Sequence, residues 1–598
     1  MSFDRLFHAK SVALVGASAT PQKGAGKAVE FLRNSGYKGR VYPVNPAYEK
    51  IGDWKCYPSM EALPETVDAM LLIVPVAAAF EALEIGARQG VPFAVLTSGG
   101  FGEGRSGADG EEKLARLRKL CADTGMKILG PNTIGMVNFY ESMPLTFADW
   151  YGRDTGQRDG VAVVTNSGSV GGLIFSSLQI NKVGIKYWIA TGNEAVIEVA
   201  DVIDELADDA DIHTICCFME GVMDGRRFMA AAEKARLAGK RILVLKAGGH
   251  EVSARSTEAH TMKRSSDAET YDAIFRQLGI SQVVSLQELT QAVKVAVALG
   301  DKAGGRTVGI ISASGGACSV FADHVADAGL DLPLLEDGLQ EELMQSIPVY
   351  GSTLNPVDVS ADIVARRDIL TGTMETLKKD DRVDTWLIFG RPIIDRYHMD
   401  IREFWKSSGK AVVVVSGVEL PAESQASLDE DKVVVVQDPE LCIRALGTLY
   451  RGAAVKGKPR RDWLATPKRT VGNGAVDAAA LLAKQGLQVS KDGGAGLKLA
   501  IVQDIDFGPV LTLGRAGLDG GWRGPRALRA LPADEQDIAK ALSEFDQAEL
   551  ADLSLSPADA VKVALSLAKL YQTEPSVAEI AVRVGSGGKI VAAEGKPS

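Results

Sequence analysis

A histidine and a carboxylate that could act together in covalent catalysis fall within one predicted domain. His260, one of six histidines, stands in Ala259-His-Thr-Met-Lys263, and Glu220 follows the apolar strand predicted at Thr214–Met219. A carboxylate can orient an imidazole and stabilise its cation or its phosphoramidate. The pair is therefore chemically reasonable as a catalytic unit, although the sequence does not show that the two residues meet. The alternative is that His260 is structural or solvated, as lone histidines usually are, and composition alone favours that alternative.

A turn suited to phosphate binding precedes this pair in the chain. Thr165-Asn-Ser-Gly-Ser169 follows a predicted strand and opens a helix, so its N–H groups and hydroxyls can face an anion at the helix start. We expect phosphate to bind through Asn166, Ser167, Gly168 and Ser169. An ordinary helix N-cap would show the same pattern. The similar turn Ser312-Ala-Ser-Gly-Gly316 has the same two interpretations.

The first glycine-rich turn, Gly16-Ala-Ser-Ala-Thr-Pro-Gln-Lys-Gly24, predicts a second anion site. It lies between a strand and a helix, but it is not G-x-G-x-x-G, and no acidic residue suited to a ribose ends the second strand. A nucleotide-type ligand other than NAD is favoured, with a tight structural turn as the alternative. Val74-Pro75, Thr97–Glu103 and Gly130–Gly135 follow later strands, at the edge where open α/β sheets bind ligands.

Alternating apolar strands and amphipathic helices position these turns. Unbroken apolar strands over residues 1–150 predict a parallel sheet covered on both faces, and the polar, glycine-rich Tyr151–Gly160 indicates a linker. Two later blocks begin alike, at Val161–Gly168 and Val308–Gly315, about one domain length apart. Two consecutive flavodoxin-like domains explain this repetition better than one large sheet.

Length and composition fit a multidomain α/β protein. The 598 residues correspond to about four domains, with 46% apolar and 24% charged residues. A net charge of −11 repels phosphate backbones and anionic lipid, so we expect no nucleic-acid and no membrane partner. The longest apolar run, Ala69–Phe80, is far shorter than the ~20 residues of a membrane span, and the N-terminus lacks a signal-peptide pattern. Six sparse cysteines without zinc-ligand spacing indicate reduced thiols, a cytoplasmic location and no metal site.

The last quarter of the chain has weaker signals. Lys456–Arg469 is basic and contains proline, so we expect a solvated linker there. Beyond it strong strand patterns are fewer, and helices are expected at Val476–Gln485 and Pro557–Tyr571.

Several motifs occur in order along residues 1–455. Besides the turns above, they are Gly192-Asn-Glu-Ala195, Met219-Glu-Gly-Val-Met-Asp-Gly-Arg-Arg227, Leu245-Lys-Ala-Gly248, Ala259-His-Thr, Tyr271-Asp-Ala-Ile-Phe-Arg-Gln277 and Asn355-Pro-Val-Asp358. Together they resemble the NDP-forming acyl-CoA synthetases, relatives of succinyl-CoA synthetase. Asn166-Ser-Gly resembles that family's phosphate-holding Gln-Ser-Gly, and Ala259-His-Thr aligns with its Ser-His-Thr phosphohistidine motif.

The resemblance implies both a fold and a reaction. The fold would comprise a Rossmann-like CoA-binding domain (1–150), two flavodoxin-like domains (158–300 and 304–455), a linker (456–472) and a shortened α+β ATP-grasp-like domain (473–598). In this family an acyl phosphate forms from a carboxylic acid, and CoA then displaces phosphate to give the thioester. His260 would carry phosphate between nucleotide and acid, Glu220 would hold the imidazole, and the Ser167–Gly168 helix start would cradle the phosphoryl group.

The resemblance also implies a CoA site at the carboxyl edge of the first sheet, and a homo-oligomer, because the family generally forms multimers. The CoA-binding residues would be Gly16, Ala17, Ser18, Lys23, Asn45, Pro46, Val74, Pro75, Ser98, Gly99, Glu103 and Asn132.

The chain departs from the family pattern where nucleotide chemistry is concerned. Met262-Lys-Arg-Ser-Ser266 is bulkier and more basic than the glycine-rich run expected after the histidine, and Thr133 replaces a common cysteine. In the tail, Ala475–Val489 resembles the opening helix of an ATP-grasp module and Asp504-Ile-Asp-Phe-Gly-Pro-Val510 its late strand, with little sequence between them. We therefore expect the nucleotide-binding lobe to be missing.

The acidic residues that would hold magnesium are also altered. Arg583 occupies the place of an asparagine in the family's magnesium motif and cannot bind a cation, whereas Glu594 would retain a second acidic position. ATP or ADP and Mg²⁺ would then be handled by an ATP-grasp partner chain or in an altered way. The substrate would be a small carboxylic acid or its acyl-CoA.

Two other functions compete with the ligase hypothesis. One is a CoA or acyl-CoA sensor or scaffold subunit without turnover. The other is an ATP-independent acyl-CoA transferase in which Glu220 carries the acyl group. Retention of both Glu220 and His260 favours the ligase over the sensor.

Overall fold

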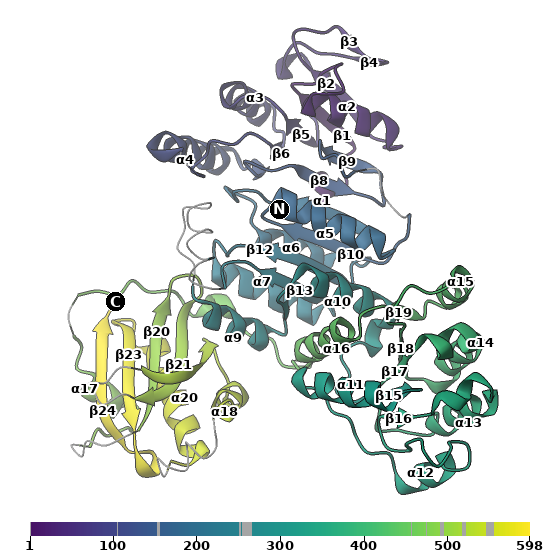
Figure 1. The fold of residues 1–598 in the computed structure, drawn as a ribbon. Helices are drawn as coiled ribbons and strands as arrows, with labels where there is room; N and C mark the ends of the chain where they lie inside the picture. Colours follow the sequence, from purple (N-terminus) through teal and green to yellow (C-terminus); the bar gives the residue numbers. More distant parts are fainter. Residues whose placement is uncertain are drawn as a thin grey trace.

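A computed structural model shows, in the residues it describes, four sheets of five or more strands and one two-stranded sheet, and the second large sheet lies at the centre (Figure 1). In the view of Figure 1 the first sheet lies above the central one, the third to its lower right and the C-terminal sheet to its lower left. The structure describes residues 2–104, 106–151, 156–249, 253, 266–455, 457–473, 475–490, 496–516, 522–545 and 555–598. His260 lies outside the described residues.

The first sheet is parallel, with strand order β2-β1-β5-β6-β7. β1, β5 and β6 are buried at every position, which explains their unbroken apolar sequences. The elements of this unit are α1 (Asp4–Phe7), β1 (Ser11–Val15), α2 (Gly24–Asn34), β2 (Arg40–Val44), β3 (Lys50–Ile51), β4 (Trp54–Lys55), η1 (Met60–Ala62), β5 (Ala69–Leu72), α3 (Val76–Arg88), β6 (Phe93–Leu96), α4 (Gly107–Thr124) and β7 (Lys127–Leu129).

The second sheet has seven strands in the order β14-β13-β12-β10-β11-β8-β9. Its elements are β8 (Gly135–Asn138), β9 (Met143–Thr146), β10 (Val161–Thr165), α5 (Gly168–Ile180), β11 (Ile185–Ala190), α6 (Val199–Asp208), β12 (Thr214–Met219), α7 (Gly225–Leu237), β13 (Arg241–Lys246), α9 (Ala268–Leu278), β14 (Ser281–Val283), α10 (Leu286–Leu299) and η2 (Gly300–Lys302). β8 and β9 fall within the range 1–150 expected for the first domain, but β8 pairs antiparallel with β11 and extends the second sheet.

The third sheet is again parallel, with the order β16-β15-β17-β18-β19. Its elements are β15 (Val308–Ser312), α11 (Gly315–Asp327), α12 (Asp337–Leu343), β16 (Val357–Asp358), η3 (Ala361–Val364), α13 (Arg367–Leu377), β17 (Thr385–Phe389), α14 (Arg391–Ser408), β18 (Ala411–Val415), α15 (Ala422–Glu430), β19 (Val434–Val436) and α16 (Pro439–Ala453).

The C-terminal sheet is antiparallel, with the order β22-β21-β20-β23-β24. Its elements are η4 (Trp463–Ala465), α17 (Ala478–Lys484), β20 (Leu497–Asp504), β21 (Gly508–Ala516), β22 (Trp522–Ala530), α18 (Glu535–Ser543), α20 (Pro557–Thr573), β23 (Val577–Val584), η5 (Ser586–Gly588) and β24 (Ile590–Pro597). Sequence patterns missed most of these long strands. Asp504–Val510, expected as one strand, is instead the hairpin joining β20 to β21.

The basic segment expected as a solvated linker is attached to the C-terminal unit at several of its described residues, 457–472, although Arg460 and Lys468 stay exposed. Arg461 forms ion pairs with Asp534 (3.1 Å) and Asp537 (2.7 Å), and Lys458 pairs with Asp537 at 3.0 Å. Trp463 is only 1% exposed and belongs to a core shared with the first two sheets. The segment holds the C-terminal sheet against the central one because its charges find acidic partners there.

Alternate residues of β10 point into two different cores. Ala162 and Val164 pack in the core that the central sheet shares with the first and C-terminal sheets, and Val161 and Val163 pack in the core shared with the third. The central sheet therefore fixes the positions of the other three. No helix in the described parts of the chain is both long and apolar enough to cross a bilayer.

Candidate functional site

The predicted CoA residues lie at the carboxyl edge of the first sheet, on turns that support one another. Gly16 has φ +86° and donates its N–H to the Val44 carbonyl at 2.9 Å. A Cβ there would stand 2.5 Å from the Ile73 carbonyl oxygen, so the close approach requires glycine. The Asn45 amide donates to the Ala17 carbonyl at 2.8 Å and so connects the first two turns.

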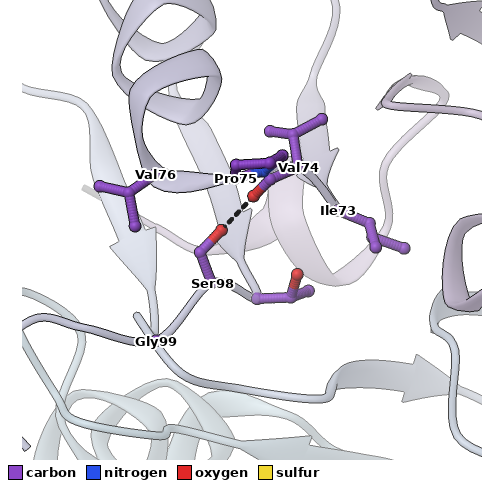
Figure 2. A pocket seen from close by; sticks show the side chains of 7 residues that line it. Ile73, Val74, Pro75, Val76, Ser98 and Gly99 are labelled. Carbon is purple, nitrogen blue, oxygen red and sulfur yellow. Dashed lines mark hydrogen bonds between the residues drawn. The ribbon is translucent and has the colours of Figure 1, made fainter.

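A pocket of about 510 Å³ opens at the same edge, between the ends of β5 and β6 (Figure 2). It is lined by Ile73, Val74, Pro75, Val76, Thr97, Ser98 and Gly99. The Ser98 hydroxyl donates to the Val74 carbonyl and joins the two strand ends. Four residues predicted to bind CoA thus surround one cavity.

Other predicted CoA residues have structural partners. One Glu103 oxygen accepts from the Gly100 N–H, and the other accepts from Phe101 N–H (2.8 Å) and Asn193 Nδ2 (2.6 Å). Burial raises the pKa of Glu103, but these bonds outweigh it and hold the pKa below its ordinary value. Glu103 therefore shapes the turn that precedes it.

Three further members of the predicted set lie close to these turns. Lys23 caps α2 through its backbone, and the Ser18 hydroxyl accepts from Thr20 N–H at 3.1 Å. The Asn132 amide donates to Asn193 Oδ1 at 3.1 Å, so this residue too is linked to the central sheet.

The phosphate turn begins α5 with a regular N-cap. The Ser167 N–H donates to Thr165 Oγ1 (3.1 Å), and the Ser167 hydroxyl accepts from Val170 N–H (3.4 Å). Within the described residues no acceptor takes the N–H of Gly168 or Ser169. These two donors at a helix start are available to an anion.

Asn166 has a role that the sequence did not suggest. Its Oδ1 accepts the backbone N–H of Glu220 at 3.0 Å, and its Nδ2 donates to Thr191 Oγ1 at 3.2 Å. The side chain thus ties the phosphate turn to the end of β12. It positions Glu220 instead of pointing both polar atoms at a phosphate.

Lys246 is a charged residue of this edge that the predicted site omitted. It ends β13, in register with Met219 of β12, so it lies beside Glu220. Its ammonium stands 4.4 Å from the centre of the Tyr271 ring. Burial lowers its pKa to about 8, against the attraction of Asp506 and Glu220. The signal available in the sequence was a lysine at the end of an apolar strand.

The C-terminal sheet reaches the same edge through the β20–β21 hairpin. Asp506 accepts hydrogen bonds from the Tyr271 hydroxyl and from the Ser266 N–H, both at 2.8 Å. The Ser266 hydroxyl donates to Asp504. The predicted partner of Glu220, His260, lies outside the described residues. Among the described residues no group of three or more His, Cys, Asp or Glu side chains is placed to hold a metal ion.

Similar proteins share this arrangement of domains. A CoA binding domain matches residues 10–138, and a succinyl-CoA ligase like flavodoxin domain matches residues 158–296. ADP-forming acetate–CoA ligase I of Archaeoglobus fulgidus is 32% identical over 76% of this chain and 64% of its own length. The alpha subunit of ADP-forming acetate–CoA ligase I of Pyrococcus furiosus is 30% identical over 77% of this chain and 99% of that subunit.

A solved structure has a similar fold over most of its length. Dinucleotide-forming acetyl-coenzyme A synthetase 1 of Ca. Korarchaeum cryptofilum, in complex with phosphate and ADP, has a TM-score of 0.69 and 27% identity, over 76% of this chain and 97% of that one. Our chain thus spans less than two thirds of the Archaeoglobus ligase but nearly all of the Pyrococcus alpha subunit. The predicted resemblance and fold class are confirmed, and the chain belongs to the NDP-forming (ADP-forming) acyl-CoA synthetase family, the relatives of succinyl-CoA synthetase.

Proposed function

We propose that this chain forms and cleaves acyl-CoA thioesters by way of an acyl phosphate, in the manner of an alpha subunit of an NDP-forming acyl-CoA synthetase. One observation carries the proposal. The free amides at the start of α5, the carboxylate Glu220 and the ammonium of Lys246 occur at the ends of β10, β12 and β13, which are neighbours in one sheet. Such an edge suits the handling of a phosphoryl group.

The proposed reaction uses the edges of two sheets, the central sheet for phosphoryl transfer and the first sheet for CoA. At the central sheet, an acid carboxylate oxygen attacks the phosphorus of phosphorylated His260, the P–N bond breaks, and an acyl phosphate leaves the imidazole neutral. The CoA sulfur then attacks the acyl carbon, the C–O bond breaks, and inorganic phosphate leaves with the thiol proton going to phosphate or solvent. CoA would reach the acyl carbon from the pocket beside Ser98.

The assignment of His260 rests on its sequence motif, because the residue lies outside the described part of the chain. We propose Glu220 as the residue that holds its imidazole. Gly168 and Ser169 would bind the phosphoryl oxygens through their N–H groups, with Asn166 and Ser167 shaping the turn.

Nucleotide chemistry is assigned to a second chain with an ATP-grasp fold, which would bind ATP or ADP with Mg²⁺. The Pyrococcus relative that this chain covers over 99% of its length is named a subunit alpha, which supports this division. In this proposal residues 473–598 are a shortened ATP-grasp-like domain that docks on the central sheet, and the complex is an oligomer. The described thiols are free and buried, in keeping with a cytoplasmic location.

The test is thioester formation from CoA, a panel of carboxylic acids, and ATP or GTP with Mg²⁺, with and without a co-expressed ATP-grasp subunit. We expect turnover that needs the second subunit and disappears in His260→Ala. Turnover by His260→Ala would exclude the phosphohistidine and favour an acyl transferase. Micromolar CoA binding without turnover under any of these conditions would favour a sensor.

A further inference from the structure

We propose that Asn193 is a positioning residue that sets the CoA turn of the first sheet against the phosphate turn of the central sheet. This inference rests on the proposed function, because thioester formation requires the CoA sulfur to meet an acyl group held at the start of α5. Reacting atoms must approach to about 3–3.5 Å, and a displacement of about 1 Å can cost a hundredfold in rate.

Toward the first sheet, both polar atoms of the Asn193 side chain form hydrogen bonds. Nδ2 donates to Glu103 Oε2 at 2.6 Å, and Oδ1 accepts from Asn132 Nδ2 at 3.1 Å. Its backbone N–H donates to the Pro131 carbonyl at 2.9 Å. These bonds bridge two turns at the CoA edge from a residue that belongs to the central unit.

The bond to Glu103 reaches the pocket through the backbone. Glu103 accepts the N–H groups of Gly100 and Phe101, which directly follow the pocket residues Ser98 and Gly99. Without Asn193 the carboxylate would lose its only side-chain donor within the described part of the chain. The Glu103 carboxylate would then be held only by backbone N–H groups of its own turn.

Toward the central sheet, Thr191 connects the turn that carries Asn193 to the phosphate turn, and Glu194 holds Thr191. Thr191 Oγ1 accepts from Asn166 Nδ2 (3.2 Å) and donates to Glu194 Oε1 (3.0 Å), and Glu194 is 6% exposed. Asn166 in turn holds the Glu220 N–H. A continuous chain of hydrogen bonds therefore runs from Glu220 to the turn that carries Asn193.

The backbone of this turn is shaped for close contact between the two units. Gly192 has φ +61°, and a Cβ there would stand 2.3 Å from the Pro131 carbonyl oxygen. Glu194 also has a positive φ, +54°, which non-glycine residues seldom adopt. The same two units are held by the Ala195 N–H, which donates to the Gly130 carbonyl at 3.0 Å. Asn193 is thus presented by a rigid turn instead of a mobile loop.

The experiment compares Asn193→Ala with Asn181→Ala. Asn181 lies at the opposite end of α5, where its amide donates to the Ser177 carbonyl at 2.9 Å and accepts from Lys294 at 3.5 Å, with no hydrogen bond to the first unit among the described residues. CoA affinity is measured by calorimetry, and the Michaelis constants for CoA and for inorganic phosphate are measured in the two directions of the reaction. We expect Asn193→Ala to raise the CoA dissociation and Michaelis constants about tenfold, with less than a twofold change for phosphate, and Asn181→Ala to change neither.

A double-mutant cycle with Glu103→Ala tests whether Asn193 affects CoA binding through Glu103. If Asn193 acts through Glu103, the double variant binds CoA about as weakly as Glu103→Ala alone, and multiplicative losses would contradict the inference. Equal weakening of CoA and phosphate would indicate a general structural role and also overturn it. Wild-type chain that binds no CoA would overturn the CoA site itself, whereas unchanged CoA constants in Asn193→Ala would overturn this inference alone.

Discussion

The central and third sheets build the same turn and surround it with different side chains. In the central unit Ser167 N–H donates to Thr165 Oγ1 at 3.1 Å, and Ser167 Oγ accepts from Val170 N–H at 3.4 Å. In the third unit Ser314 N–H donates to Ser312 Oγ at 3.1 Å, and Ser314 Oγ accepts from Ala317 N–H at 3.4 Å. The two helix starts are equivalent in geometry.

Strand register shows which residues correspond around the two turns. Val161 pairs with Thr214 as Val308 pairs with Thr385, and each next strand continues the match. By this register Asn166 corresponds to Ala313, Glu220 to Arg391, and Lys246 to Ser416. At these positions the third unit therefore lacks the amide, the carboxylate and the ammonium of the central unit.

The difference between the two units shows that the fold supplies the helix start, whereas the proposed function also requires particular side chains around it. A strand followed by a serine-capped helix gives free N–H groups in both units. In the central unit the carboxylate is that of Glu220, whose backbone N–H is held by Asn166, whereas in the third unit the carboxylate of Asp358 lies beside Gly315 at the helix start. Arg391 instead pairs with Asp395 on its own helix, at 2.8 Å. The helix start by itself is not evidence of a site, so the added side chains must be tested against their counterparts.

The largest effect on turnover is expected from changing the Glu220 carboxylate. Glu220→Gln should lower turnover at least about 100-fold, because the neutral amide no longer stabilises an imidazolium or phosphoimidazole. Arg391→Gln should change turnover less than about twofold, as an exposed surface substitution. Steady-state turnover of both variants is the measurement. Equal losses would abolish the distinction between the two units.

Asn166→Ala should have the next largest effect. It leaves the Glu220 N–H without its acceptor and removes one donor to the Thr191 hydroxyl, which keeps its bond to Glu194, a loss of about 2 kcal/mol, or about thirtyfold in turnover. Ala313→Asn, the reciprocal change, should leave turnover as it is. Wild-type turnover in Asn166→Ala would show that Glu220 is positioned by other contacts.

Lys246 predicts a pH dependence of stability that Ser416 does not share. Its folded pKa, about 8, lies below the ordinary lysine value of 10.5, so between these values the unfolded chain binds more protons and folding becomes more favourable as pH rises. The slope is at most about 1.4 kcal/mol per pH unit.

Melting temperatures from pH 7 to 10.5 test this difference. Relative to wild type, Lys246→Met should lose the rise between about pH 8 and 10.5, where the Lys246 charge is being removed. Ser416→Ala should follow wild type throughout. Parallel curves for wild type and Lys246→Met would contradict a lowered pKa.

The smallest effects are expected from changing the two N-cap serines, one in each unit. Ser167→Ala and Ser314→Ala should each destabilise their domain by about 1 kcal/mol, because each removes one N-cap hydrogen bond. Only Ser167→Ala should also weaken inorganic phosphate binding. Equal phosphate effects would mean that the third unit has a second anion site.

Strands buried on both faces could be predicted closely from the sequence. Thr214–Met219 has the predicted bounds, because a parallel strand covered by helices is buried along its whole length. The strands of the C-terminal sheet were missed because polar residues and glycines interrupt their apolar sequences. Charge alone suggested a solvated linker around Arg461, whereas its partners Asp534 and Asp537 are distant in sequence.

The candidate site was predicted by residue type but not by contact. Glycines and the serine of the turns were identified because backbone geometry demands them locally. The roles of Asn166, Glu103 and Asn193 depend on hydrogen bonds between strand ends that only the tertiary fold brings together. Lys246 was overlooked as a site residue because a lysine after an apolar strand is usually solvated.

The central claim is that the edge of the central sheet exchanges a phosphoryl group through His260, and one measurement tests it without the nucleotide subunit. The chain is incubated with radiolabelled inorganic phosphate and acyl-CoA thioesters, beginning with acetyl-CoA, and covalent label is mapped. We predict acid-labile label at His260 that requires the acyl-CoA, disappears in His260→Ala, falls sharply in Glu220→Gln and persists in Arg391→Gln. Label that survives in His260→Ala, or no label with any thioester from a wild-type chain that binds CoA, would contradict the account.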